Sequence, residues 1–192
     1  IYSMAKDLGF GGIEVRGLGE DIFAVNARPF TDEQLPKTVE KLRSLGLEIP
    51  CLASGCGLKY KEDFDKNVSE VTQYIVLAKK LGTPYIRVLG DRYPQPEGEV
   101  DDEFVVSALK LLGTIAQGFG VSLLVETNGV YSDTRRKSSF CGSPVGYAPP
   151  VSVWRRIPQG DCGASGLLHQ ICSCQGQRHG GRQSSVPVDG RR

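Results

Sequence analysis

The sequence predicts an α/β fold, part of a (β/α)8 TIM barrel with about four to five βα units, followed by an irregular, non-native tail. Apolar runs begin near residues 12, 48, 85 and 121, about 36 residues apart, and a helical pattern separates each run from the next. This alternation is typical of a parallel sheet with helical crossovers. The even spacing and the polar residues at the ends of the runs favour a barrel. No G-x-G-x-x-G turn follows any run, so a dinucleotide-binding sheet has no support.

The first two units are recognised by their apolar patterns and their glycines. Residues 1–8 are predicted to be the end of a helix closed by Gly9, and residues 12–16 (G-I-E-V-R) a short buried strand. Thr31 is predicted to cap the next helix, because threonine hydroxyls accept hydrogen bonds from the N–H groups of a first turn. Apolar residues then recur at helical spacing until Gly46 ends that helix.

The later units repeat this pattern. The predicted strands span residues 48–53, 85–89 and 121–126. The predicted helices span residues 67–81 and 101–119. Gly82 and Gly120 follow these helices, as expected for residues that end a helix in the left-handed conformation.

The composition changes abruptly at Thr134. Residues 1–134 carry 14 Lys and Arg against 20 Asp and Glu, a net charge of −6, whereas residues 135–192 carry nine basic and two acidic residues, a net charge of +7. The second segment holds four of the six cysteines, both histidines and only two leucines. Such a composition does not easily build a core. We therefore predict one domain at residues 1–134 and a tail without a core at residues 135–192.

Three motifs give the domain a family resemblance. They are residues 9–16 (G-F-G-G-I-E-V-R), 85–90 (Y-I-R-V-L-G) and 121–129 (V-S-L-L-V-E-T-N-G). In this order and spacing they resemble the second, fourth and fifth strands of xylose isomerase-like TIM barrels of the sugar phosphate isomerase/epimerase kind. The resemblance covers residues 1–134. It implies that the chain is a fragment, with a first strand and half a helix missing ahead of Ile1.

The resemblance also implies a chemistry. Proteins of this family bind a divalent metal (Mn, Mg, Co or Zn) with Glu, Asp, His and Glu from strands five to eight. The metal polarises an oxygen of a sugar or sugar phosphate, and carboxylates move a proton at a carbon next to a carbonyl. On that pattern Glu126 is the first metal ligand and a catalytic residue. The sequence as written supplies no second ligand, so this chain is expected to bind no metal and to be inactive as an isomerase or epimerase.

Further polar residues near the strand ends are candidates for contacts with substrate. Arg87 and Asp91 flank the end of one strand and suit sugar hydroxyls or phosphate. Asn128 either holds a substrate hydroxyl or forms a turn with the glycine that follows it. Glu14 and Arg16 alternate with apolar neighbours, so one of them either faces the barrel mouth or forms a salt bridge low in the barrel. For Arg16 we favour the salt bridge.

A shifted reading frame explains the tail. When the last two bases of each codon are joined to the first base of the next, residues 145–152 permit W-D-M-H-H-P-Y-R. Residues 168–192 permit a second run that contains V-H-V-K-D. Both strings resemble the sixth and seventh strands of the same family, which hold its Asp and His ligands. We therefore predict a frameshift between Thr134 and Phe140.

The tail also contains patterns that suggest other sites. Its cysteines and histidines lack the paired C-x-x-C units of a zinc site. Its arginine-rich end, residues 178–192, has no interleaved aromatic residues, so we expect no nucleic-acid partner. No apolar run is long enough to span a membrane. Cys51 and Cys56 are expected to be free thiols in a reducing, cytoplasmic location.

Three other functions remain as alternatives. A dehydratase of cyclic polyols would use the same fold and similar residues. An apurinic-site endonuclease shares the barrel but uses three zinc ions and many histidines, of which the shifted frame adds only a few. The third alternative is an inactive gene fragment, because five of eight units cannot close a barrel. An isomerase or epimerase of sugar metabolism would have a small molecule, a sugar or sugar phosphate, as its partner.

Overall fold

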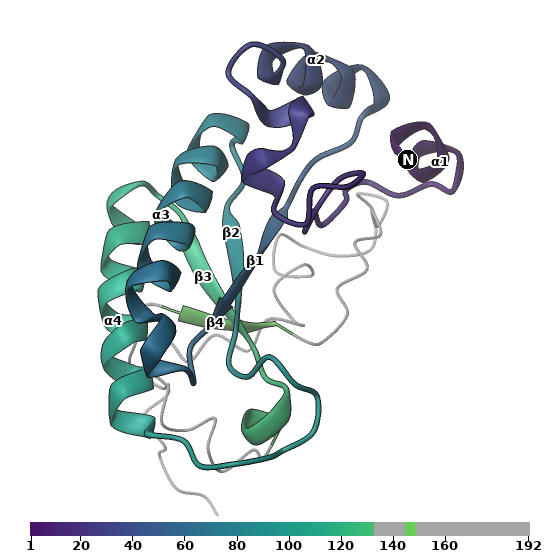
Figure 1. Cartoon of the computed structure of the whole chain (residues 1–192). Helices are drawn as coiled ribbons and strands as arrows, with labels where there is room; N and C mark the ends of the chain where they lie inside the picture. Colours follow the sequence, from purple (N-terminus) through teal and green to yellow (C-terminus); the bar gives the residue numbers. More distant parts are fainter. Residues whose placement is uncertain (133–144, 149–192) are drawn as a thin grey trace, which may run out of the picture.

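The computed structural model describes residues 1–132 and the backbone of residues 145–148 (Figure 1). The helices are α1 (Tyr2–Asp7), α2 (Leu35–Leu45), α3 (Phe64–Leu81) and α4 (Asp102–Gly118). The strands are β1 (Cys51–Gly57), β2 (Tyr85–Leu89), β3 (Ser122–Glu126) and β4 (Val145–Ala148). All neighbouring strands are parallel, in the order β1-β2-β3-β4. This is the partial barrel that the strand spacing predicts.

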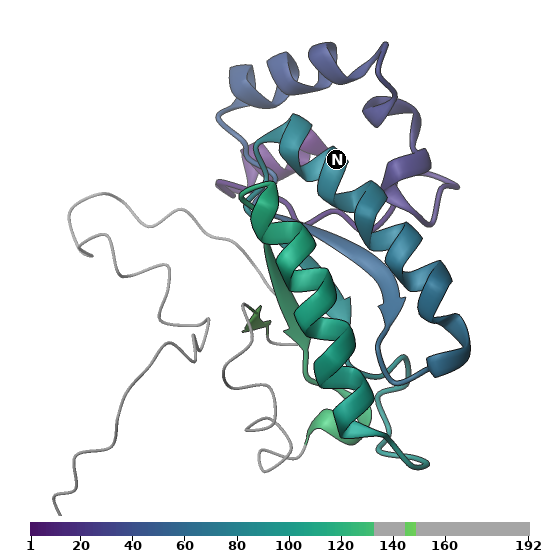
Figure 2. The same ribbon diagram turned by 90° about the vertical axis from the view of Figure 1, so that its left-hand side faces the viewer.

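Helices α3 and α4 lie side by side on one face of the sheet (Figure 2). Every second residue of a strand points to that face, and Leu52, Ile86 and Leu123 pack there with no exposed surface. The opposite face carries a second, smaller apolar cluster of Cys51 and Leu124. The main core is therefore the layer between helices and sheet, and the second face is the one that would line a barrel.

The helix ends follow the residues that the sequence places there. Gly46 and Gly82 end α2 and α3 in the left-handed conformation, with φ of 64° and 71°. Asp101 caps α4, because its carboxylate accepts a hydrogen bond of 3.0 Å from the backbone N–H of Phe104. These caps satisfy backbone groups that a helix end leaves without partners.

Two predicted details of the first half are wrong. Thr31 does not cap α2: its hydroxyl donates to the carbonyl of Arg28, and the helix begins only at Leu35. Residues 12–16 form no regular strand; they make isolated parallel bridges, from Gly12 to Glu48 just before β1 and from Val15 to Leu52 within it. Among the described residues, this segment pairs with a single neighbouring segment, residues 48–52, so the pairing stays short.

Strand β1 also differs from its prediction. It begins three residues later than residue 48 and continues to Gly57. Its pairing with β2 shifts between Ala53 and Gly57, so the end of β1 is irregular. This irregularity re-aims the residues that follow, as bulges at barrel rims do.

Strand β4 lies inside the segment for which the sequence predicts no regular structure. Its backbone pairs in parallel with β3, from Leu123 opposite Val145 to Glu126 opposite Ala148. The rest of the predicted tail, and the proposed frameshift point between Thr134 and Phe140, lie outside the described residues. Within the described part of the chain, no helix combines the length and apolar character needed to cross a membrane.

Candidate functional site

The candidate site is on the face of the sheet that lies away from α3 and α4. Arg87 pairs in register with Leu124, and Leu89 pairs with Glu126. Because residues in register point to the same side, Arg87 and Glu126 share one face. Glu126 is the last residue of β3, so its side chain sits at the carboxyl end of the sheet, where TIM barrels place their chemistry.

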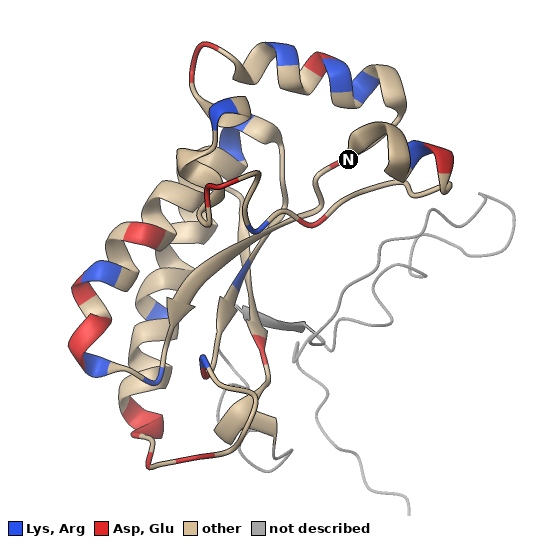
Figure 3. Ribbon diagram, turned by 45° about the vertical axis from the view of Figure 1, so that its right-hand side comes forward, with Lys and Arg blue, Asp and Glu red and all other residues tan. Residues whose placement is uncertain are grey.

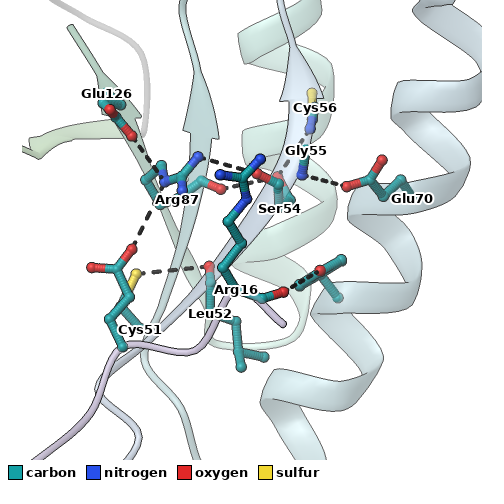
Figure 4. A network of polar contacts seen from close by, with 11 residues as sticks. Arg16, Cys51, Leu52, Ser54, Gly55, Cys56, Glu70, Arg87 and Glu126 are labelled. Carbon is teal, nitrogen blue, oxygen red and sulfur yellow. Dashed lines mark hydrogen bonds and ion pairs between the residues drawn. The ribbon is translucent and has the colours of Figure 1, made fainter. Parts of the chain in front are cut away.

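Arg87 joins two carboxylates on this face (Figure 4). Its Nε lies 3.1 Å from Oε2 of Glu126 and 3.8 Å from Oε1 of Glu14. The side chain of Arg87 is 10% exposed, that of Glu126 15% and that of Glu14 23%. Water therefore screens these ion pairs less than it screens pairs on an open surface.

The guanidinium of Arg87 is held from the neighbouring strand. Its Nη1 donates to the carbonyl of Ser54 at 3.2 Å, and the Ser54 hydroxyl donates to the carbonyl of Arg87 at 2.9 Å. Ser54 lies in β1 and is fully buried. The reciprocal pair fixes the direction in which Arg87 extends toward the two glutamates.

Glu14 has an unusual electrostatic environment. Burial raises the pKa of Glu14, and the nearby charge of Glu126 raises it further, whereas Arg87 opposes both effects. A carboxyl group whose pKa is raised keeps its proton to higher pH and is better able to exchange it. Glu14 is therefore a candidate proton carrier beside Glu126.

A second cluster surrounds Asp91, which follows β2 and is only 1% exposed. Its carboxylate accepts hydrogen bonds from the Tyr60 hydroxyl at 2.8 Å and from Nζ of Lys59 at 3.1 Å. The backbone N–H groups of Tyr93 and Val130 donate to it at 3.3 and 3.4 Å. Burial by itself would raise the pKa of Asp91, but these hydrogen bonds outweigh it and lower the pKa below its usual value.

This cluster holds the loop that follows Glu126. The side-chain Oδ1 of Asn128 accepts from the backbone N–H of Asp91 at 3.3 Å. Gly129 has a φ of +54°, and a Cβ added there would lie 2.6 Å from Cβ of Asp91. Asn128 and Gly129 thus form the turn, packed directly on Asp91, that sets where the chain leaves β3.

The structure therefore divides the sequence-predicted site residues into two groups. Glu14, Arg87 and Glu126 meet on the sheet face, whereas Asp91 and Asn128 meet in the adjacent loops. Their roles toward a substrate stay predictions. Sequence reasoning missed Lys59 and Tyr60, because the predicted strand ended at residue 53 and placed no polar cluster after it. Had the strand been extended to Gly57, both would have followed a strand end.

The described residues do not form a metal site. No group of three or more His, Cys, Asp or Glu in residues 1–132 is arranged to hold a metal ion. Glu126 contributes one carboxylate at the end of β3, and its Oε2 lies next to Arg87. A hard divalent cation needs several such oxygens, so the remaining ligands would have to come from elsewhere.

Comparison with known families identifies the domain. The model of a family described as xylose isomerase-like TIM barrel matches residues 3–136. Among curated proteins, none matches the chain at a significant level.

Solved structures share the fold at low identity. A xylose isomerase-like TIM barrel protein from Mycobacterium smegmatis in complex with magnesium is 17% identical, with a TM-score of 0.59 over 77% of this chain and 54% of that one. The probable 3-DHS dehydratase AsbF from Bacillus anthracis is 19% identical, with a TM-score of 0.61 over 77% and 55%. The 3-keto-D-glucoside 4-epimerase YcjR from E. coli is 15% identical, with a TM-score of 0.56 over 77% and 61%. This chain thus spans little more than half the length of these structures.

Proposed function

The chain belongs to the xylose isomerase-like TIM barrel family, and from this premise we propose that it derives from a metal-dependent isomerase or epimerase of sugars or sugar phosphates. The observation that carries the proposal is the position of Glu126. It ends β3 on the inner face, its carboxylate is oriented by Arg87 at 3.1 Å, and a second carboxylate, Glu14, lies on the same guanidinium.

The proposed roles of these residues follow from their environments. Glu126 would be one ligand of a divalent metal, which in the complete protein supplies Lewis-acid polarisation of a sugar oxygen. Arg87 holds Glu126 in place and balances its charge. Glu14, with its raised pKa, would accept or return a proton at the substrate. Asp91 fixes the loop behind Glu126 and so determines the direction of its backbone.

The similar structures support this proposal by their own properties. One contains magnesium and another is an epimerase of a keto-glucoside. A third, the probable dehydratase, has the same fold. Because the dehydratase and the epimerase resemble this chain to a similar degree, dehydration should be assayed together with isomerisation.

The chain as written is proposed to be inactive. It spans little more than half of the similar structures, and the described residues offer one metal ligand. The proposed frameshift between Thr134 and Phe140 would remove the aspartate and histidine that complete the site. Resequencing the DNA across codons 130–145 tests this explanation directly.

The site itself is tested in a protein whose frame has been restored. Glu126→Gln keeps the size of the side chain but removes its charge, so bound manganese and proton exchange at the sugar carbon should fall together. Glu62→Gln on the exposed surface is the matched control, because it removes an equal charge away from the site. Metal content and exchange that stay the same in Glu126→Gln would remove Glu126 from the proposal.

A further inference from the structure

A cavity lies at the rim of the sheet, next to the Arg87 cluster (Figure 4). It has a volume of about 260 Å³ and is lined by Arg16, Gly55, Lys66, Asn67, Glu70 and Arg92, together with apolar side chains. The three cationic residues come from three successive segments: the loop after the first bridge to β1, the first turn of α3, and the loop after β2. All follow the carboxyl ends of their strands, so the cavity is on the same rim as Glu126.

The cavity has rigid walls. Asn67 is 4% exposed and its Nδ2 donates to the carbonyl of Gly57 at 3.0 Å. The Glu70 carboxylate accepts from the backbone N–H of Gly55 at 2.5 Å, reaching across from α3 to β1 (Figure 4). This hydrogen bond occupies one oxygen of the only acidic side chain that the described residues contribute to the lining. The shape of the cavity is therefore set before any ligand arrives.

The cationic residues differ in whether their charge is already balanced. Arg92 forms an ion pair with Asp63 and stacks over the ring of Tyr60, with its Cζ 4.4 Å from the ring centroid. Arg16 and Lys66 have no ion pair with any residue in the described part of the chain. The salt bridge that the sequence favours for Arg16 is therefore not found within residues 1–132, and it stays a prediction. Two cationic side chains thus face the cavity without an acidic partner among residues 1–132.

Acidic residues also lie near the start of α3, where Figure 3 shows acidic and basic positions close together. Glu62 and Asp65 do not line the cavity, and Asp63 is used by Arg92. Inside the cavity the three cations face one carboxylate, Glu70. The lining is therefore net positive, although residues 1–134 as a whole carry a net charge of −6.

We propose that this cavity binds a phosphate group carried by a small-molecule substrate, with Arg16 and Lys66 as its main contacts. A phosphate monoester carries between one and two negative charges at neutral pH. Arg16 and Lys66, opposed by the single carboxylate of Glu70, leave the lining net positive toward such a group. Arginine forms paired hydrogen bonds with phosphate oxygens, and lysine acts as a point charge. The volume suits one anionic group with a few attached atoms, since complete ligands fill about 300 Å³ or more.

The cavity would serve the reaction by anchoring the end of the substrate that does not react. Binding energy gained at such a distant group positions the reacting carbon. The anion site itself is independent of the metal; its use as a substrate subsite rests on the proposed function. It selects phosphorylated over unphosphorylated sugars among the substrates that the family fold could serve.

The test is a titration of the full 192-residue chain with inorganic phosphate, by calorimetry in low salt with a chelator present. The test variant is Arg16→Gln with Lys66→Gln. The matched control is Arg28→Gln with Lys79→Gln, which removes two exposed cations outside the cavity. All four side chains are exposed, so circular dichroism should show the same fold in all proteins. We expect affinity to fall about tenfold in the test variant, as for loss of about 1.4 kcal/mol, and less than about twofold in the control.

Two results of this titration would overturn the proposal. Absence of saturable phosphate binding, or an equal loss of affinity in both variants, would mean that no built anion site exists. A second arm compares fructose 6-phosphate with fructose. Tighter binding of the sugar phosphate than of inorganic phosphate, lost in the test variant, supports a substrate subsite, and equal binding of the two anions would reject that use. Because Glu126→Gln should leave phosphate binding unchanged, failure of the metal proposal and failure of this one are distinguishable.

Discussion

The Nε of Arg87 in β2 lies 3.1 Å from Oε2 of Glu126 in β3, so the residue proposed as a metal ligand is already paired with a fixed cation. The contact depends on the register that places Leu89 opposite Glu126, with Arg87 two residues before Leu89 on the same face. The guanidinium therefore fixes the orientation of this partly buried carboxylate. The carboxylate can then present its other oxygen toward the mouth of a barrel.

Replacing Arg87 should destabilise the domain. In Arg87→Leu the carboxylates of Glu14 and Glu126 lose their shared counter-charge while remaining largely buried, at a cost of about 2 kcal/mol in the free energy of unfolding. Arg87→Lys keeps the charge and should lose about half as much. Urea unfolding monitored by circular dichroism measures both. Leucine and lysine variants of equal stability would show that the ion pairs contribute nothing.

Asp91 should make stability depend on pH. Its folded-state pKa is lowered, so its contribution is present above the unfolded pKa of about 4 and is lost as pH falls through the folded value. Asp91→Asn should therefore unfold about 2 kcal/mol more easily at neutral pH. The difference between wild type and variant should shrink toward about pH 3 and below. If the stability difference between wild type and variant stayed constant across this pH range, the charge of Asp91 would not contribute to stability and only its hydrogen bonds would.

Gly129 should tolerate no side chain. Its φ is +54°, and a Cβ would lie 2.5 Å from the carbonyl oxygen of Tyr93 and 2.6 Å from Cβ of Asp91. Gly129→Ala should cost about 2 kcal/mol or more, by strain and by displacement of the loop behind Glu126. Gly98→Ala is the control, because Gly98 also has a positive φ, of +73°, but its nearest neighbour is 3.5 Å away. If both variants lost equal stability, backbone strain alone would explain the loss, and the steric contact at Gly129 would contribute nothing.

The sequence predicted the elements better than the site. Strand β2 matches residues 85–89 because its apolar run is bounded by Pro84 and Gly90, and α3 ends where Gly82 stands. The start of β1 was wrong because the apolar run from residue 47 enters the core before the ladder begins. Local patterns determine where such runs lie but not the register between them.

The clusters of the site depend on that register. Glu14, Arg87 and Glu126 come from three segments, and only the pairing of β2 with β3 brings the last two together. The link from Asp91 to Val130 spans 39 residues of sequence and has no local signal. Sequence analysis could therefore name the individual candidates, whereas their partners became visible only in the folded chain.

Cys51 and Cys56 should be unreactive in the folded domain. Burial raises the pKa of each thiol to about 12, so almost no thiolate exists at neutral pH. Iodoacetamide labelling followed by peptide mapping should leave both unmodified in buffer and modify both in concentrated urea. Peptide mapping reports each cysteine separately, so the other four do not interfere. Rapid labelling of Cys56 in buffer would contradict its full burial.

The chain as written should not retain a divalent metal, although it contains Glu126. One carboxylate binds a hard cation weakly in water, because Mg²⁺ and similar ions give up hydration only to several oxygen ligands. Arg87 adds a positive charge 3.1 Å from Oε2 of the same carboxylate, which opposes an incoming cation. Manganese titrated into the chain and followed by electron paramagnetic resonance should therefore stay in its free form, and added manganese should produce no turnover of ketoses or ketose phosphates.

Arg87→Leu separates the two reasons for weak metal binding, the missing ligands and the nearby positive charge. If the variant binds manganese weakly while the parent chain does not, the guanidinium is the main obstacle, whereas absence of binding in both indicates that the missing ligands are. Stoichiometric manganese binding by the parent chain would show that residues 1–192 already contain a complete site, and the missing ligands would no longer be an argument for a frameshift.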